Sequence, residues 1–342
     1  MASASIRPAL VAAAAGLVAL LAGCAAEPPP PPPPPPPPSV SLSPSLIDQA
    51  SAYRLYMQRA AAISPAFSDG AQVASGVKVG ASYEPQQLLK GAMAYGAIAA
   101  LQDPTFVAAL RGAAADRTQR YDLAHRIIAN PSTVLGVGGA AGAAGLVVAA
   151  VGGDGRAVFT AGRNIKQAAY DVQHSAWSKA DVADRPSRLS VVKGLSVTPL
   201  AGEAAETLRL QQAATGAGSM GLSADAVRPP YTPFVVRSLA VAALAGLGFG
   251  GADYLPQANA ILAEPGTSAC LTMSKLNLYQ CLAVAKPHYE DVFCLGQHAL
   301  MDTGRCLSRG VGAADAIEVY PQPLKVAGPV SPAPPASTPA KP

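Results

Sequence analysis

The sequence contains few of the side chains that perform chemistry. Charged residues make up 13% of its 342 residues, aromatic residues 5%, and there are 4 histidines. The motif His-Glu-x-x-His is absent and no carboxylates are paired in a recognisable motif, so we assign no catalytic residue, metal or cofactor. Lys and Arg outnumber Asp and Glu by only 25 to 21, without clustering, which argues against a nucleic-acid partner.

The first 24 residues have the three parts of an export signal. Arg7 precedes an uncharged run of Ala, Val, Leu and Gly at residues 9–21, and small residues follow. At about 13 residues this run is too short to cross a bilayer, which takes roughly 20. One interpretation is an ordinary signal peptide with a chance cysteine near its end. The other is that the run ends in the four residues of a lipobox, which are Leu21, Ala22, Gly23 and Cys24.

The end of this signal resembles that of bacterial lipoproteins, and the resemblance is confined to residues 1–24. It implies that Cys24 receives diacylglycerol, that the chain is cut after Gly23, and that the new amino terminus is acylated. Two or more acyl chains give stable anchoring in a membrane. Ala25 follows the cysteine where some lipoproteins have Asp. In bacteria with two membranes, the resemblance therefore implies an outer-membrane anchor facing the periplasm.

Two proline-rich segments flank the predicted globular body. Residues 28–38 are eleven consecutive prolines, which can form neither helix nor sheet. A polyproline II rod of about 34 Å is expected. Directly after a lipid anchor it would hold the body off the membrane; a docking site for a proline-recognising partner is the alternative. The predicted organisation is a signal peptide (1–23), a tether (24–40), a helical body (41–265), a Cys-rich helical hairpin (266–320) and a disordered tail (321–342).

Apolar residues in the body recur at helical spacing, and no run of alternating Val, Ile and Thr competes with this pattern. The predicted fold class is therefore all-α. Ser, Asp-Pro and Glu-Pro mark several helix starts. Tyr53 and Tyr56 are expected to face inward. The predicted helices cover residues 46–63, 84–101, 103–114, 118–129, 154–179 and 203–214.

Two apolar segments resemble membrane spans. Residues 133–153 carry no charge, and as a helix they would measure about 31 Å, enough to cross a bilayer core. Small residues at four-residue spacing would let another helix approach closely. Because Gly and Ala contribute little transfer energy and no basic cluster flanks the segment, we predict a buried helix rather than a membrane span. Residues 238–252 are too few to span a membrane and are predicted to be core.

Four cysteines lie near the end of the body. Cys270 and Cys281 are eleven positions apart, about three helical turns, so both project from one face. Cys294 and Cys306 are twelve positions apart, and Gly304 is predicted to end their helix. An even number of cysteines in an exported protein indicates a disulfide framework.

Three pairings of these cysteines are possible. A turn at residues 286–288 would fold two antiparallel helices so that the first cysteine faces the last and the second faces the third. Geometry favours this nested pairing. A zinc site is the alternative, since Cys294 and His298 are one helical turn apart, but no two cysteines have the tight spacing of structural zinc sites.

One predicted helix face carries a set of polar side chains. Tyr170, His174 and Trp177 follow at i, i+4 and i+7, and Asp171 is within reach of His174. An aspartate beside a histidine orients the ring and raises its basicity, as acid–base catalysis requires. Trp177 would form a wall facing a ligand. The alternative is a face packed on a neighbouring segment, with His174 satisfied by Asp171.

Residues 216–221 match the glycine pattern of dinucleotide-binding loops. A helix rather than a strand is predicted before them, so we interpret them as a flexible loop. Ala217 stands where a nucleophile elbow has glycine, which makes Ser219 a poor nucleophile candidate.

Two main functional hypotheses follow. The favoured one is a lipid-anchored structural or adaptor component of the cell envelope, without enzymatic activity, that binds another envelope protein. The second is a lipid-anchored periplasmic enzyme or ligand-binding protein that uses Tyr170, Asp171, His174 and Trp177. An integral membrane component that inserts residues 133–153 is a third possibility.

Overall fold

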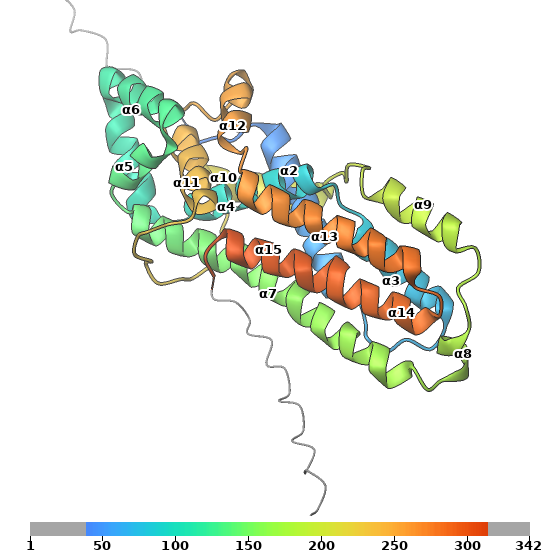
Figure 1. The fold of residues 1–342 in the computed structure, drawn as a ribbon. Coiled ribbons are helices and arrows are strands. Elements are labelled where there is room, and N and C mark those ends of the chain that lie inside the picture. Colours follow the sequence, from blue (N-terminus) through green and yellow to red (C-terminus); the bar gives the residue numbers. More distant parts are fainter. Residues whose placement is uncertain (1–38, 314–342) are drawn as a thin grey trace, which may run out of the picture. The chain divides into compact units, whose positions relative to one another are not determined.

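The computed structural model describes residues 39–313, and this part of the chain contains helices but no β-strand (Figure 1). The all-α prediction is confirmed. The lipobox at Cys24, the proline run and the predicted tail lie outside the described residues. The helices that precede the C-terminal hairpin are α2 (Pro44–Ala61), α3 (Gly70–Ala81), α4 (Pro85–Ala100), α5 (Pro104–Ala115), α6 (Arg117–Ala129), η1 (Pro131–Gly136), α7 (Ala140–Val172), α8 (Ala176–Lys179), α9 (Arg185–Leu195), α10 (Ala204–Thr215), α11 (Pro233–Gly246), η2 (Ala252–Tyr254) and α12 (Leu255–Ile261).

Side-chain caps define where these helices begin. The Glu84 carboxylate accepts hydrogen bonds from two backbone N–H groups in the first turn of α4, at 3.0 and 2.6 Å. Asp103 accepts one from the first turn of α5 at 2.7 Å. These contacts satisfy donors that the first turn leaves unpaired. Both predicted starts are confirmed, whereas α2 begins slightly earlier than predicted, with Ser43 as its cap.

Helix α4 lies in the hydrophobic core between α2, α7 and α11. From Leu88 onward, every residue of α4 except Lys90 is buried. The apolar segment that begins at residue 238 is buried through Leu247, which confirms that it is core. Tyr53 and Tyr56 face inward from α2, as predicted.

The predicted helices at 133–153 and 154–179 are one helix, α7, and both boundaries are corrected. Residues 131–136 form the short 3-10 helix η1. Gly139 then precedes α7 with φ of 82°, a left-handed conformation that glycine adopts without strain. By length and composition α7 could cross a membrane, but 61% of its most apolar window is buried within the body. This burial favours the predicted core helix.

The C-terminal hairpin has two long antiparallel arms, as predicted (Figure 1). The first arm is α13 (Pro265–Val284). The second consists of α14 (His288–Cys294), the π-helix η3 (Leu295–Met301) and α15 (Asp302–Gly310), and its backbone stays right-handed helical at both junctions. The prediction that Gly304 ends this helix is wrong, because Gly304 lies inside α15.

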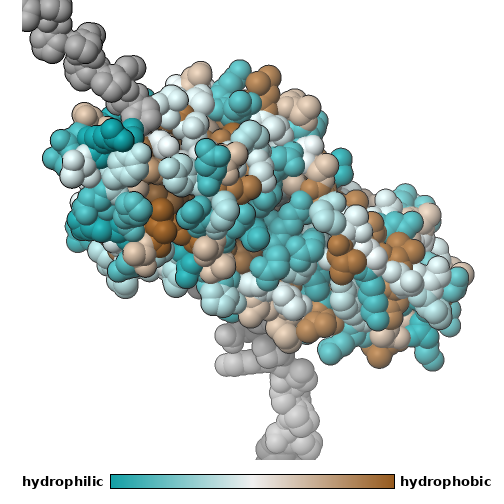
Figure 2. Space-filling view, turned by 90° about the horizontal axis from the view of Figure 1, so that it is seen from above, coloured by the Kyte–Doolittle hydropathy of each residue, from teal (hydrophilic) through white to brown (hydrophobic). Residues whose placement is uncertain are grey.

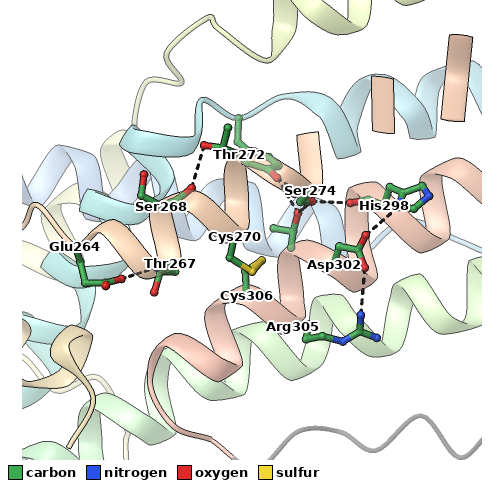
Figure 3. Close-up of a disulfide and its surroundings, with 12 residues drawn as sticks. Glu264, Thr267, Ser268, Cys270, Thr272, Ser274, His298, Asp302, Arg305 and Cys306 are labelled. Atoms are coloured by element: carbon green, nitrogen blue, oxygen red, sulfur yellow. Dashed lines mark hydrogen bonds and ion pairs between the residues drawn. A yellow bond between two sulfur atoms is a disulfide. The ribbon is translucent and has the colours of Figure 1, made fainter. Parts of the chain in front are cut away.

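Two disulfides join the arms of the hairpin in the nested arrangement. Cys270 pairs with Cys306 and Cys281 with Cys294, with Cα–Cα distances of 5.6 and 5.7 Å. Figure 3 shows the first of these bonds bridging α13 and α15. The predicted pairing is confirmed. Since the Cys294 sulfur is in a disulfide, the structure gives the alternative zinc site no thiolate at this position.

Glycines let α7 approach the second arm of the hairpin closely. A Cβ atom added at Gly304 would lie 2.5 Å from the carbonyl oxygen of Gly155. A Cβ atom added at Gly296 would lie 2.8 Å from the carbonyl oxygen of Gly162. No side chain fits at such distances, so these four positions require glycine. The hairpin and the preceding helices consequently share one compact unit.

Candidate functional site

The polar set predicted on one helix face is not brought together. Helix α7 ends at Val172, so the helical spacing that would align Tyr170 with His174 and Trp177 does not continue. His174 is exposed beyond the helix end. Asp171 accepts a hydrogen bond from Gln167 at 3.0 Å.

The aromatic members of that set lie in different surroundings. Trp177 belongs to the short helix α8 and packs beside His288, with 6.4 Å between ring centroids. Tyr170 is 50% exposed and lines a mainly apolar groove of about 380 Å³. The same groove is lined by the Cys281–Cys294 disulfide. The described residues therefore contain no Tyr-Asp-His-Trp cleft.

A different cleft, of about 450 Å³, gathers charged side chains. Its polar walls come from Arg54 on α2, Tyr95 on α4, Asp154 on α7, and Glu206 with Arg209 on α10. We call these five residues the charged cluster. They are separated by up to 155 positions in sequence and meet only through the packing of four helices.

Hydrogen bonds from neighbouring segments position the walls of this cleft. Ser51 on α2 donates to the carbonyl oxygen of Glu203 at 3.1 Å and accepts from its N–H at 3.0 Å, which fixes the start of α10 against α2. Gln102 accepts from the backbone N–H of Met220 at 3.1 Å and donates to Ala213 at 2.9 Å. Met220, a lining residue of the cleft, is thereby tied to the turn that follows α4.

The charged cluster is internally paired. Arg54 Nη1 donates to Asp154 Oδ1, and Arg54 Nε lies 3.7 Å from Glu206 Oε1. Arg209 binds Glu206 through Nε and Nη2, at 2.8 and 2.6 Å. The Arg54 guanidinium also lies over the Tyr95 ring, 5.0 Å from its centroid, in cation–π geometry.

The environment shifts the pKa values of these groups in opposite directions. Burial raises the pKa of Asp154 above its ordinary value, although Arg54 opposes this shift. The hydrogen bonds from Arg209 lower the pKa of Glu206. Burial also raises the pKa of Tyr95. Glu206 is therefore ionised and Tyr95 protonated at neutral pH.

Behind the cleft, the hydroxyl of Tyr53, Oδ2 of Asp154 and Nε of Arg54 are buried atoms. Tyr53 and Asp154 interact directly, since each is among the causes of the other's pKa shift. Burial, with the Asp154 charge as the next cause, raises the pKa of Tyr53 well above its ordinary value.

A second buried ionisable group lies in the core. Lys275 is 3% exposed, donates from Nζ to the carbonyl oxygen of Ala81 at 2.5 Å, and lies 3.4 Å from the centroid of Tyr83. Burial lowers its pKa well below the ordinary value. Its contacts join α13 to the connection between α3 and α4, which is a structural role. Within residues 39–313, no three His, Cys, Asp or Glu side chains are grouped to hold a metal.

The other predicted motifs lie away from the charged cluster or line its edge. Residues 216–221 follow α10 as irregular chain, and Gly216 ends the helix with φ of 78°. This agrees with the interpretation as a loop rather than a dinucleotide-binding turn, and the segment contributes Met220 to the cleft wall.

Sequence reasoning missed the charged cluster because its members are far apart in the chain. The available signal was Asp154 itself, the first charge after the 27 uncharged residues 127–153 and flanked by Gly152, Gly153 and Gly155. It was interpreted as a helix start. In the structure it lies inside α7, where its partner comes from α2.

Comparison with known proteins finds no matching family model, no similar curated protein and no similar solved structure.

Proposed function

We propose that this chain is a lipid-anchored protein of the bacterial cell envelope that acts as a structural or adaptor component. The observation that carries the proposal is the use of its five cysteines. Four form two disulfides inside one hairpin, and disulfides persist in oxidising compartments outside the cytoplasm. The fifth, Cys24, stands at the end of the lipobox. The disulfides support export independently of the signal sequence.

Two features support the adaptor role: the proline run beside the body and the exposed apolar side chains on its surface. A proline run directly after the anchor would act as a spacer of about 34 Å. Helix α13 exposes Met273, Leu276 and Val284 by 53, 44 and 74%. Figure 2 shows hydrophobic side chains on one face of the body as small separate patches among hydrophilic ones. Such a surface suits a partner that is bound by several modest contacts.

Lipid labelling tests the anchor. The full chain is produced in a bacterium with two membranes that is fed radiolabelled palmitate. Label in the wild type, its loss in Cys24→Ala, and its retention in a Cys270→Ala, Cys306→Ala control are expected. Release of Cys24→Ala from the membrane fraction is also expected. An unlabelled wild type refutes lipidation, and a Cys24→Ala form that stays in the membrane favours insertion of α7 instead.

Crosslinking in intact envelopes tests the adaptor role. The wild type, captured from crosslinked cells, is expected to carry one envelope protein in stoichiometric amount. Cys24→Ala, which keeps the same body, is expected to lose most of that partner because it leaves the membrane surface. Absence of any enriched envelope protein contradicts the adaptor role and leaves the anchoring result unaffected.

A further inference from the structure

Gly153 is the feature of α7 that internal packing does not explain. Glycine is one of the least favourable residues in a helix interior. At Gly152 an added Cβ would lie 2.9 Å from Ala313, and at Gly155 it would lie 2.6 Å from Ser308 Oγ. At Gly153 it would meet no atom within 4 Å. The space that it would fill belongs to the 450 Å³ cleft beside the charged cluster.

Small residues on one side of α7 line the base of this cleft. Ala149, Ala150 and Gly153 line it, and Asp154 follows at the edge. Because no group of the described residues occupies the space over Gly153, the missing side chain leaves room for a molecule from outside. A volume of 450 Å³ is within the range of small-molecule sites.

The charges around this space indicate what the molecule carries. Two guanidinium and two carboxylate groups give no net charge, so a ligand with only one charge would be repelled by half of the cluster. The pairing of Arg209 with Glu206 uses Nε and Nη2 and leaves Nη1 out. The pairing of Arg54 with Asp154 likewise uses Nη1 and leaves Nη2 out. A carboxylate is the natural partner for such nitrogens.

The opposite end of a ligand has acceptors within the same cluster. The side chains of Asp154 and Glu206 are 17% and 14% exposed. The Tyr95 ring at the same wall is covered by the Arg54 guanidinium, so the carboxylates are the groups available to an ammonium ion.

We infer that the cleft over Gly153 binds a small zwitterion that carries a carboxylate and an ammonium group, such as an amino acid or a short peptide. The carboxylate is bound by Arg54 and Arg209, and the ammonium by Asp154 and Glu206. This site is separate from the lipid anchor and from the exposed residues of α13, so its test does not depend on the adaptor role.

Calorimetric titration of the detergent-solubilised full-length protein with the dipeptide alanyl-alanine tests the inference. Binding is expected for the free dipeptide. Its N-acetyl derivative and its methyl ester, which each lack one charge, are expected to bind at least about tenfold more weakly, because a charge-assisted hydrogen bond is lost. Equal binding of the three compounds, or no binding of the dipeptide, overturns the inference.

Matched variants connect the binding to the cleft. Gly153→Leu fills the space and is expected to abolish binding, while Gly194→Leu, at an open helical glycine outside the cleft, leaves it unchanged. Arg209→Gln is expected to weaken binding about tenfold, while Arg126→Gln, in an exposed ion pair on α6, has no effect. Circular dichroism at 222 nm verifies that each variant is folded. Unchanged binding in folded Gly153→Leu refutes this location.

Discussion

Removal of the disulfides gives the most quantitative test of the fold. Cys270 and Cys306 are 36 positions apart, and the Cys281–Cys294 bond, with a separation of 13, lies inside their loop. A crosslink stabilises mainly by reducing the entropy of the unfolded chain, and its effect grows with the length of the closed loop. The chain-entropy relation gives about 3 kcal/mol for the inner bond alone and about 4 kcal/mol for the outer bond alone.

Because one loop lies inside the other, the stabilisation from both bonds together is smaller than the sum of their separate contributions. With the inner bond in place, the outer loop contains only roughly 24 free residues, so the outer bond contributes about 3.4 kcal/mol. Loss of both bonds is therefore expected to cost about 6 kcal/mol rather than about 7. Since a domain is stable by roughly 5–15 kcal/mol, this loss takes a large part of the total.

Urea unfolding followed by circular dichroism measures these differences. The two pairwise Cys→Ala variants and the fourfold variant are compared with the oxidised wild type. Alanine at Cys294 also leaves a small cavity, so the reduced wild type, which keeps every sulfur atom, is the control. A fourfold variant within about 1 kcal/mol of the wild type refutes the entropic reasoning. So does an inner bond that contributes clearly more than the outer one.

Three further substitutions test buried contacts by urea unfolding. Lys275→Met is expected to be more stable than the wild type at pH 7. The wild type should gain stability as the pH rises toward 10.5, because Lys275 binds a proton more tightly in the unfolded chain than in the fold, and the variant should lack this gain. Stability curves that run parallel with pH contradict this. Arg188→Met leaves the 2% exposed Asp291 unpaired and should cost about 3–5 kcal/mol at pH 7. Burial already raises the pKa of Asp291, so part of that loss should be recovered in acid, and a loss that deepens in acid opposes the assignment. Gly162→Leu should lower the free energy of unfolding by about 3 kcal/mol through overpacking. Its counterpart Gly112→Ala, in open space on α5, should raise that free energy by up to about 1 kcal/mol.

Local signals in the sequence predicted local structure well. Glu84 and Asp103 cap the helices that they were expected to start, because capping depends on atoms within one turn. The nested cysteine pairing was also predictable from two neighbouring arms joined by a short turn, although the spacing of twelve on the second arm matches that of the first only through η3. These features depend on residues in the same element or in adjacent ones.

Features that depend on distant segments were not predictable. Asp154 was expected to begin a helix because it ends an uncharged run, whereas Arg54 on α2 gives it a partner inside α7. The charged cluster exists only once four helices have packed. Conversely, the set around His174 depended on an unbroken helix, and α7 ends at Val172 before reaching that residue.

The π-helix η3 explains why glycines and cysteines on the second arm of the hairpin are spaced one residue wider than those on α7 and α13. Gly155 and Gly162 are seven positions apart, about two α-helical turns, and share a face; Gly296 and Gly304 are eight apart and would diverge by about 80° on a regular α-helix. The wider turns of η3 absorb one residue, so that both of the latter glycines face α7. The same residue accounts for the cysteines, because the spacing of twelve across η3 then matches the spacing of eleven on α13. One inserted residue thus aligns the second arm with α7 on one side and with α13 on the other.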